Sequence, residues 1–118
     1  MKNYVKEGDS IALTAPAAAV SGVPFVVGPA GFKLVGVPQT DAAVSEQVEC
    51  VIEGVVELTK DSADNFVEGE PVYWDDSAKK ADKSASTLVP FGYSVETTAA
   101  SAVLMKVKLN GVPGVPVP

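Results

Sequence analysis

Residues 47–59 read Gln-Val-Glu-Cys-Val-Ile-Glu-Gly-Val-Val-Glu-Leu-Thr, and the architecture expected for the whole chain follows from this stretch. Three glutamates, Glu49, Glu53 and Glu57, share one side of the stretch when residues are taken two at a time. Because successive side chains of a strand point to opposite faces, this alternation predicts a half-buried central β-strand. The apolar face consists of Val48, Cys50, Ile52, Val56 and Leu58.

A helical interpretation of the same stretch is weaker. Val48, Val51, Val55 and Leu58 do recur at helical spacing. The stretch is, however, rich in β-branched residues, which lose rotamer freedom in a helix. Gly54 in its middle costs a helix about 1 kcal/mol relative to alanine, whereas in a strand it marks a bend or bulge. We therefore expect a strand.

Composition narrows the function classes. The chain has 118 residues, enough for one domain with a single core, and is 47% apolar and 20% charged. Its net charge is −6, all nine basic residues are lysines, and histidine is absent. An acidic chain without arginine is a poor binder of nucleic acid. A chain without histidine lacks the commonest general base and metal ligand, so we expect no enzyme, no cofactor and no metal site.

The single cysteine excludes an internal disulfide. Cys50 falls on the apolar face of the central stretch, where a buried and inert thiol is expected. No run approaches the roughly 20 apolar residues of a membrane span, so no membrane partner is expected. Residues 1–7 lack the apolar core of a signal peptide. These features favour a reducing compartment.

The rest of the chain alternates between short apolar runs and turn signals. Its clearest feature is a hairpin, in which Gly28-Pro29-Ala30-Gly31 joins residues 23–27 to residues 32–37. Phe66 lies in an acidic, turn-rich segment and is expected to fold back as a core plug. Short strands without a long helix predict an all-β fold, a small single-domain β-sandwich or barrel-like fold with at most one short helical turn. The other expected strands are residues 10–14, 71–74, 88–97 and 102–109.

Two of these strands carry specific expectations. In residues 102–109 the apolar face is Val103, Met105, Val107 and Leu109, opposite two lysines, which suits pairing with the glutamate-bearing stretch 47–59. In residues 88–97 one face is expected to hold Phe91, Tyr93 and Val95.

Motifs that resemble chemical sites have simpler explanations. Asp61 with Asp64, and Asp75 with Asp76, lack the alternating oxygen ligands of a calcium loop, so solvated turn carboxylates are expected. Tyr73 and Trp74 are neighbours on a strand and point to opposite faces, so they do not form one stacking platform. We expect one of the two in the core and the other partly exposed.

An ordered set of glycine, proline and aromatic landmarks resembles the small phage capsid cement, or decoration, proteins. The resemblance extends from about Tyr4 to Gly111. The landmarks are Gly8-Asp9-Ser10-Ile11, Thr14-Ala15-Pro16-Ala17-Ala18, Val20-Ser21-Gly22, Val35-Gly36-Val37, Glu53-Gly54-Val55-Val56-Glu57-Leu58, Gly69-Glu70-Pro71-Val72-Tyr73-Trp74-Asp75, Pro90-Phe91-Gly92-Tyr93 and Val107-Lys108-Leu109-Asn110.

The resemblance implies a structural, non-enzymatic virion protein. Such a protein binds the major capsid protein on the outside of an icosahedral phage head, often as a homo-trimer, and holds neighbouring capsomers together. It would be made in the cytoplasm of the bacterial host and end on the capsid exterior. The family has no catalytic residues to transfer.

Two segments flank the expected domain, and neither fits a core. The domain is placed at residues 1–111, followed by a proline-rich apolar tail at residues 112–118. We hypothesise that both segments are interaction segments, since extended segments of this kind lie along neighbouring subunits; frayed termini are the open alternative. The residues concerned are Lys2, Asn3, Tyr4, Val5, Lys6, Val112, Pro113, Val115, Pro116, Val117 and Pro118.

A second function stays open at this point. β-Sandwiches often serve as carbohydrate- or surface-binding modules, and here the exposed aromatic residues would carry that activity. Loss of glycan binding in Trp74→Ala would support it. Fold class alone does not choose between the two functions.

Overall fold

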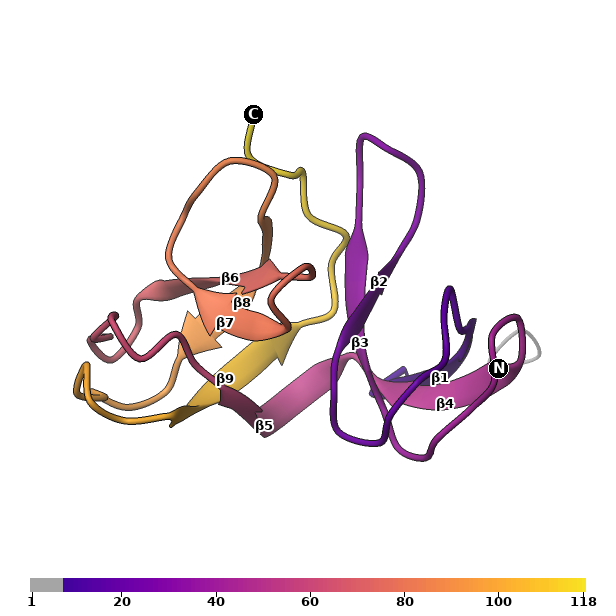
Figure 1. The fold of residues 1–118 in the computed structure, drawn as a ribbon, viewed down its shortest axis with the longest axis horizontal. Helices are drawn as coiled ribbons and strands as arrows, with labels where there is room; N and C mark the ends of the chain where they lie inside the picture. Colours follow the sequence, from indigo (N-terminus) through magenta and orange to yellow (C-terminus); the bar gives the residue numbers. More distant parts are fainter. Residues whose placement is uncertain (1–7) are drawn as a thin grey trace, which may run out of the picture.

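The computed structural model describes residues 8–118 and confirms the all-β fold (Figure 1). These residues form two antiparallel sheets and no helix. None of them therefore belongs to a helix long and apolar enough to cross a membrane. The strands are β1 (Ser10–Thr14), β2 (Phe25–Val27), β3 (Leu34–Pro38), β4 (Gln47–Val51), β5 (Glu53–Thr59), β6 (Pro71–Asp75), β7 (Lys80–Asp82), β8 (Val89–Ser94) and β9 (Leu104–Asn110).

The first sheet has the order β1-β4-β3-β2. The expected hairpin forms its β2–β3 half, with Phe25 opposite Gly36. Pro24 precedes β2 and Pro38 ends β3, positions at which the missing N–H of proline is tolerated. Residues 15–22 form turns and bends without a helical turn, because Pro16 and Gly22 leave too little length for one.

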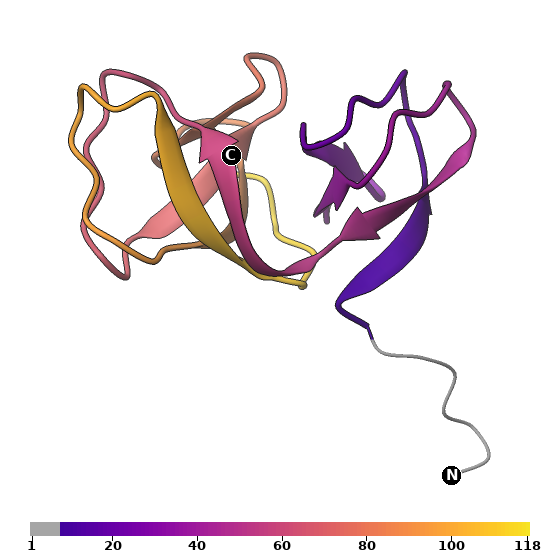
Figure 2. The same ribbon diagram turned by 90° about the horizontal axis from the view of Figure 1, so that it is seen from below.

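The second sheet has the order β5-β9-β8-β6-β7 and curls toward a barrel. Its two outer strands approach each other where Lys60 forms a parallel bridge with Ala81. The N–H of Asp61 donates to the carbonyl oxygen of Ala81 at 3.0 Å. The two sheets form two lobes, joined by the passage from β4 to β5 (Figure 2).

The central stretch is extended as predicted, but it forms two strands in different sheets, not one. Ile52 lies between them, and the N–H groups of both Ile52 and Glu53 donate to the carbonyl oxygen of Asp9. Gly54 has φ 111°, a conformation that glycine adopts without the strain of a side chain, so the chain bends here. The alternation of buried and exposed residues nevertheless continues in phase across the bend.

The pairing of residues 102–109 with this stretch is confirmed. β9 lies antiparallel to β5, with Lys106 directly opposite Glu57 and Lys108 opposite Val55. Met105, Val107 and Leu109 are buried on the inner face, as expected. Val103 is 63% exposed, so its expected place on that face is wrong; it precedes β9 and lies outside the regular pleat.

The expected common face of Phe91 and Tyr93 is also wrong. Phe91 is buried, whereas Tyr93 is 45% exposed. The ladder between β6 and β8 shifts register between Val72 and Tyr73, which leaves Phe91 as an extra residue on β8. Such a bulge turns the side chains beyond it to the other face.

The core lies mainly within the second sheet. Phe66 is completely buried there, which confirms its role as a plug. A smaller cluster, which includes Phe25 and Cys50, stabilises the first sheet. The larger cluster consists of Val35, Val37, Leu58, Phe66, Val72, Trp74, Ala81, Val89, Phe91, Met105, Val107 and Leu109.

The C-terminal segment, residues 112–118, crosses from one lobe to the other. Gly114 exchanges two backbone hydrogen bonds of 2.8 Å with Lys33, at the β2–β3 hairpin. Val117 donates to the carbonyl oxygen of Leu88 and accepts from the N–H of Thr87, next to β8. Figure 1 shows this segment, in yellow, running between the hairpin and the second sheet. It therefore acts as a strap that holds the hairpin to the second lobe.

Candidate functional site

The strap and the neighbouring hairpin expose several apolar side chains. Val112 and Val115 of the strap are 60% and 59% exposed, and Phe32, next to Lys33 in the hairpin, is 56% exposed. The antiparallel bridge between Lys33 and Gly114 puts Phe32 and Val115 at neighbouring positions. We refer to Phe32, Val112 and Val115 as the tail patch. Its backbone is fixed at both ends, so these side chains are presented to solvent in a defined arrangement.

The residues singled out from the sequence divide into two groups. In the strap, Pro113 and Pro118 are exposed, while Pro116 and Val117 are half-buried against the fold. The strap thus both joins the lobes and offers exposed side chains. The other group, Lys2, Asn3, Tyr4, Val5 and Lys6, lies outside the described residues.

A groove separates the lobes on the side of residues 16–26. One hollow of about 450 Å³ is lined by Pro16, residues 17–20, residues 23–26, Asp76 and Lys79. A second hollow of about 330 Å³ continues along β5 and shares Val23, Pro24 and Lys79 with the first. The only charged groups on the first wall, Asp76 and Lys79, form an ion pair of 2.7 Å. The second hollow has Glu57 and Lys79 as the charged residues of its wall.

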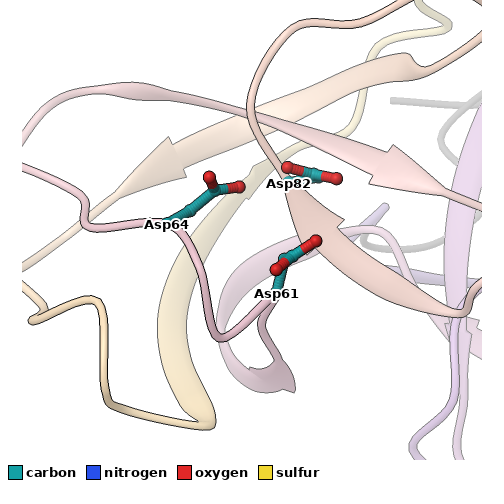
Figure 3. A group of neighbouring side chains, drawn as sticks. All are labelled: Asp61, Asp64 and Asp82. Atoms are coloured by element: carbon teal, nitrogen blue, oxygen red, sulfur yellow. The ribbon is translucent and has the colours of Figure 1, made fainter.

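Three carboxylates meet where the second sheet closes. Asp61 and Asp64 follow β5, and Asp82 ends β7; one oxygen from each lies within 4.8 Å of the others (Figure 3). All three residues are half-buried, so Asp61 and Asp64 are less solvated than the turn carboxylates that the sequence predicts. Three such oxygens are fewer than the six to eight that Ca²⁺ takes. The three carboxylates alone therefore do not complete a calcium site, and their proximity makes this aspartate cluster a strongly acidic part of the fold.

Burial and crowding alter the titration of the cluster. Loss of hydration, a hydrogen bond with Asp64 and the nearby charges of Asp64 and Asp61 raise the pKa of Asp82 to about 6. A backbone hydrogen bond from Lys83 opposes this rise. Because the folded-state pKa exceeds the ordinary value of 3.8, ionisation of Asp82 weakens the fold as pH rises through about 4 to 6.

We expect Asp82→Asn to stabilise the protein at pH 7.5 and to have almost no effect near pH 3.5. The asparagine oxygen still accepts from the Lys83 N–H but carries no charge. After allowance for screening at a half-buried group, the gain at pH 7.5 is about 1–2 kcal/mol. Thermal unfolding at both pH values measures it. Other carboxylates also titrate in this range; the hydrogen bond with Lys83, for example, lowers the pKa of Glu70. Because the wild type and Asp82→Asn share these groups, their contributions cancel in the difference between the two unfolding free energies.

Asp41→Asn is the matched control, since it removes one charge from an exposed residue that accepts from the Ser21 N–H. An equal gain in both variants, or a gain for Asp82→Asn that is the same at both pH values, contradicts the assignment.

Tyr73 and Trp74 do not form a shared binding platform. Trp74 is 1% exposed and its ring meets that of Phe91 edge-on, with centroids 6.0 Å apart. Its indole N–H donates to Asp76 at 3.3 Å. Tyr73 is half-buried, which confirms the expected division between the two neighbours. Of these two neighbours, Trp74 is thus the core residue.

Cys50 is completely buried, which confirms the expected inert thiol. Loss of hydration, and secondarily the charge of Glu49, raise its pKa to about 11. The thiol therefore stays protonated at neutral pH and is a poor nucleophile.

Sequence reasoning missed one buried charge, Lys60. Its side chain is 2% exposed, and its ammonium donates to the carbonyl oxygens of Asp61, Asp64 and Ala100. A signal was present in the sequence: Lys60 follows Val56 and Leu58 at alternate positions and so continues their inward-facing row. Lys60 thereby fixes the loop that carries Asp61 and Asp64.

Comparison with known protein families matches residues 5–109 of the chain to one family, described as phage cement protein. The chain matches none of the curated proteins with which it was compared.

Proposed function

The chain belongs to the phage cement protein family, and from this membership we propose that it binds the outer surface of an icosahedral phage head and stabilises the contacts between capsomers. The family indicates a capsid-stabilising, structural role in the virion rather than an enzymatic one. The partner that we propose is the major capsid protein.

The tail patch is the observation that carries this proposal. Two exposed apolar side chains, Val112 and Val115, are held on a segment that is fixed by backbone hydrogen bonds to both lobes, and the exposed Phe32 lies beside that segment in the hairpin. Apolar side chains gathered in this way mark interaction surfaces, and rigid presentation lowers the entropy that binding costs. A protein that holds capsomers together needs a contact surface that keeps its structure under mechanical load.

The charge of the chain supports an exterior position. A net charge of −6 with no arginine disfavours capture by packaged nucleic acid. We place the protein on the capsid exterior after synthesis in the host cytoplasm. Several copies, as a homo-trimer, would link several capsid subunits at once and so gain strength from multivalency.

We expect Val112→Ser/Val115→Ser to weaken capsid binding at least tenfold while leaving the melting temperature nearly unchanged. Both side chains are more than half exposed, so their loss costs the fold little, whereas a tenfold change corresponds to about 1.4 kcal/mol of lost contact. Titration against capsids that lack the protein, followed by pelleting, gives the affinity.

The control is Val20→Ser/Val67→Ser, which makes the same chemical change at residues that are 56% and 57% exposed elsewhere. If the two double variants bind capsids with equal affinity, the tail patch is not part of the capsid interface. Deletion of the strap is a poorer experiment, since it also removes the backbone bonds to Lys33, Thr87 and Leu88.

A further inference from the structure

β9 passes into the strap through a short junction, Asn110 and Gly111 (Figure 1). Asn110 ends the strand and is exposed, so water reaches its side-chain amide. Gly111 has φ 67°, and a Cβ built on it would lie 2.7 Å from Cγ of Glu53. Both facts require glycine at this position. Asn110 is therefore followed by a residue that has no side chain to shield its backbone nitrogen.

The side chain of Asn110 folds back toward Gly111. Its Oδ1 accepts from the N–H of Val112 at 2.9 Å, which makes an Asx turn. The hydrogen-bonded ring of this turn contains both Cγ of Asn110 and the backbone nitrogen of Gly111, so the two atoms stay near each other. Within residues 8–118, no backbone carbonyl accepts from the N–H of Gly111. No backbone hydrogen bond to these residues thus holds this nitrogen away from Cγ.

We propose that Asn110 deamidates spontaneously in the folded protein, with the backbone nitrogen of Gly111 as the nucleophile. This nitrogen forms a bond to Cγ of Asn110 and gives up its proton, while the Cγ–Nδ2 bond breaks and Nδ2 leaves as ammonia. The product is a cyclic succinimide. One water molecule then adds to either of its two carbonyl groups and opens the ring to aspartate or to isoaspartate.

The fold assists this ring closure in two ways. The Asx turn keeps the nucleophile and Cγ together, and this proximity removes part of the entropy cost of the reaction. The attack also places negative charge on Oδ1, to which the N–H of Val112 already donates. A hydrogen-bond donor aimed at developing charge lowers the barrier, as in an oxyanion hole.

Asn65 has the opposite arrangement and is the internal reference. It is also exposed, but the residue after it is Phe66, whose side chain is completely buried. The N–H of Phe66 donates to the carbonyl oxygen of Thr98 at 2.9 Å. Because this nitrogen is shielded by a side chain and held by a hydrogen bond, Asn65 is expected to stay intact.

Deamidation alters the attachment of the strap. Asn110 lies directly opposite Glu53 in the ladder between β5 and β9, so either product puts two negative charges face to face. Isoaspartate also adds a methylene group to the main chain, which shifts the strap relative to Lys33, the partner of Gly114. The reaction therefore loosens the strap as the protein ages. It needs only water and does not depend on capsid binding.

The test is incubation of the purified protein in mildly alkaline buffer, followed by proteolysis and mass spectrometry of samples taken over time. The peptide with Asn110 is expected to gain the mass of one deamidation about tenfold faster than the peptide with Asn65. An isoaspartyl methyltransferase detects isoaspartate in the same peptide. The melting temperature of the wild type is expected to fall during incubation. Asn110→Gln, whose longer side chain closes the ring poorly, is expected to keep both its mass and its melting temperature.

Protein unfolded in guanidinium chloride separates the effect of the fold from that of the sequence. The folded protein is expected to react at least as fast as the unfolded protein, because the fold supplies the Val112 donor. The proposal is overturned if Asn110 in the folded protein reacts no faster than Asn65, or more slowly than it does in the unfolded protein. The consequence for the strap is overturned if Asn110→Gln and the wild type lose melting temperature equally during incubation.

Discussion

Lys60→Met is expected to lower the free energy of unfolding by about 3–5 kcal/mol, a large part of the stability of a small domain. The methionine side chain fills similar space but donates no hydrogen bond. It leaves the carbonyl oxygens of Asp61, Asp64 and Ala100 without their common donor. A buried polar group without a partner costs about 1–3 kcal/mol, so three of them account for the size of the effect.

Urea unfolding at pH 7 measures this loss. Lys106→Met makes the same substitution at an exposed residue of β9 and is expected to change the stability by less than about 0.5 kcal/mol. If Lys60→Met is as stable as Lys106→Met, the ammonium does not hold the loop and the description of this site is wrong.

Trp74→Ala is expected to destabilise the fold to a similar extent, by about 3–5 kcal/mol. The indole is 1% exposed in the main core and packs against Phe91, so its removal leaves a cavity among residues that cannot fully collapse. The hydrogen bond from its N–H to Asp76 is lost as well. Calorimetric or chemical unfolding measures the loss.

The same variant clarifies the carbohydrate-binding alternative. Since Trp74 lies in the core, lost glycan binding in Trp74→Ala would report unfolding rather than a missing contact. Tyr93 is 45% exposed, so Tyr93→Ala is the informative variant, and it is expected to melt close to the wild type. A Trp74→Ala protein as stable as Tyr93→Ala would contradict the buried position of the indole.

The sequence was sufficient for the class of fold because local patterns agreed with one another. The alternation in residues 47–59, the turn at residues 28–31 and the alternation in residues 102–109 each predicted a strand or hairpin that the structure contains. The pairing of β5 with β9 could also be predicted, because glutamates on one strand and lysines on the other favour neighbouring positions.

What escaped prediction depends on contacts between residues distant in the chain. The division of residues 47–59 between two sheets depends on Asp9, whose carbonyl oxygen binds Ile52 and Glu53. The bulge at Phe91 reverses the face of Tyr93, and no local pattern marks it. Such irregularities are set by tertiary packing rather than by residue preference.

The sites show the same limit. Asp61 and Asp64 are close in the sequence, but their partner Asp82 lies on another strand, and only the closure of the sheet brings it near. The composition of residues 112–118 predicts a segment apart from the core. Its attachment to Lys33 and Leu88 was not foreseen, because a proline-rich apolar segment carries no register of its own.

Capsid binding is most directly tested by co-sedimentation with expanded, mature-form heads that lack this protein. We expect saturable binding at a fixed ratio of copies to capsomers, together with a higher melting temperature of the decorated head. Absence of binding to both mature and immature heads, with the protein folded, would contradict the proposed function.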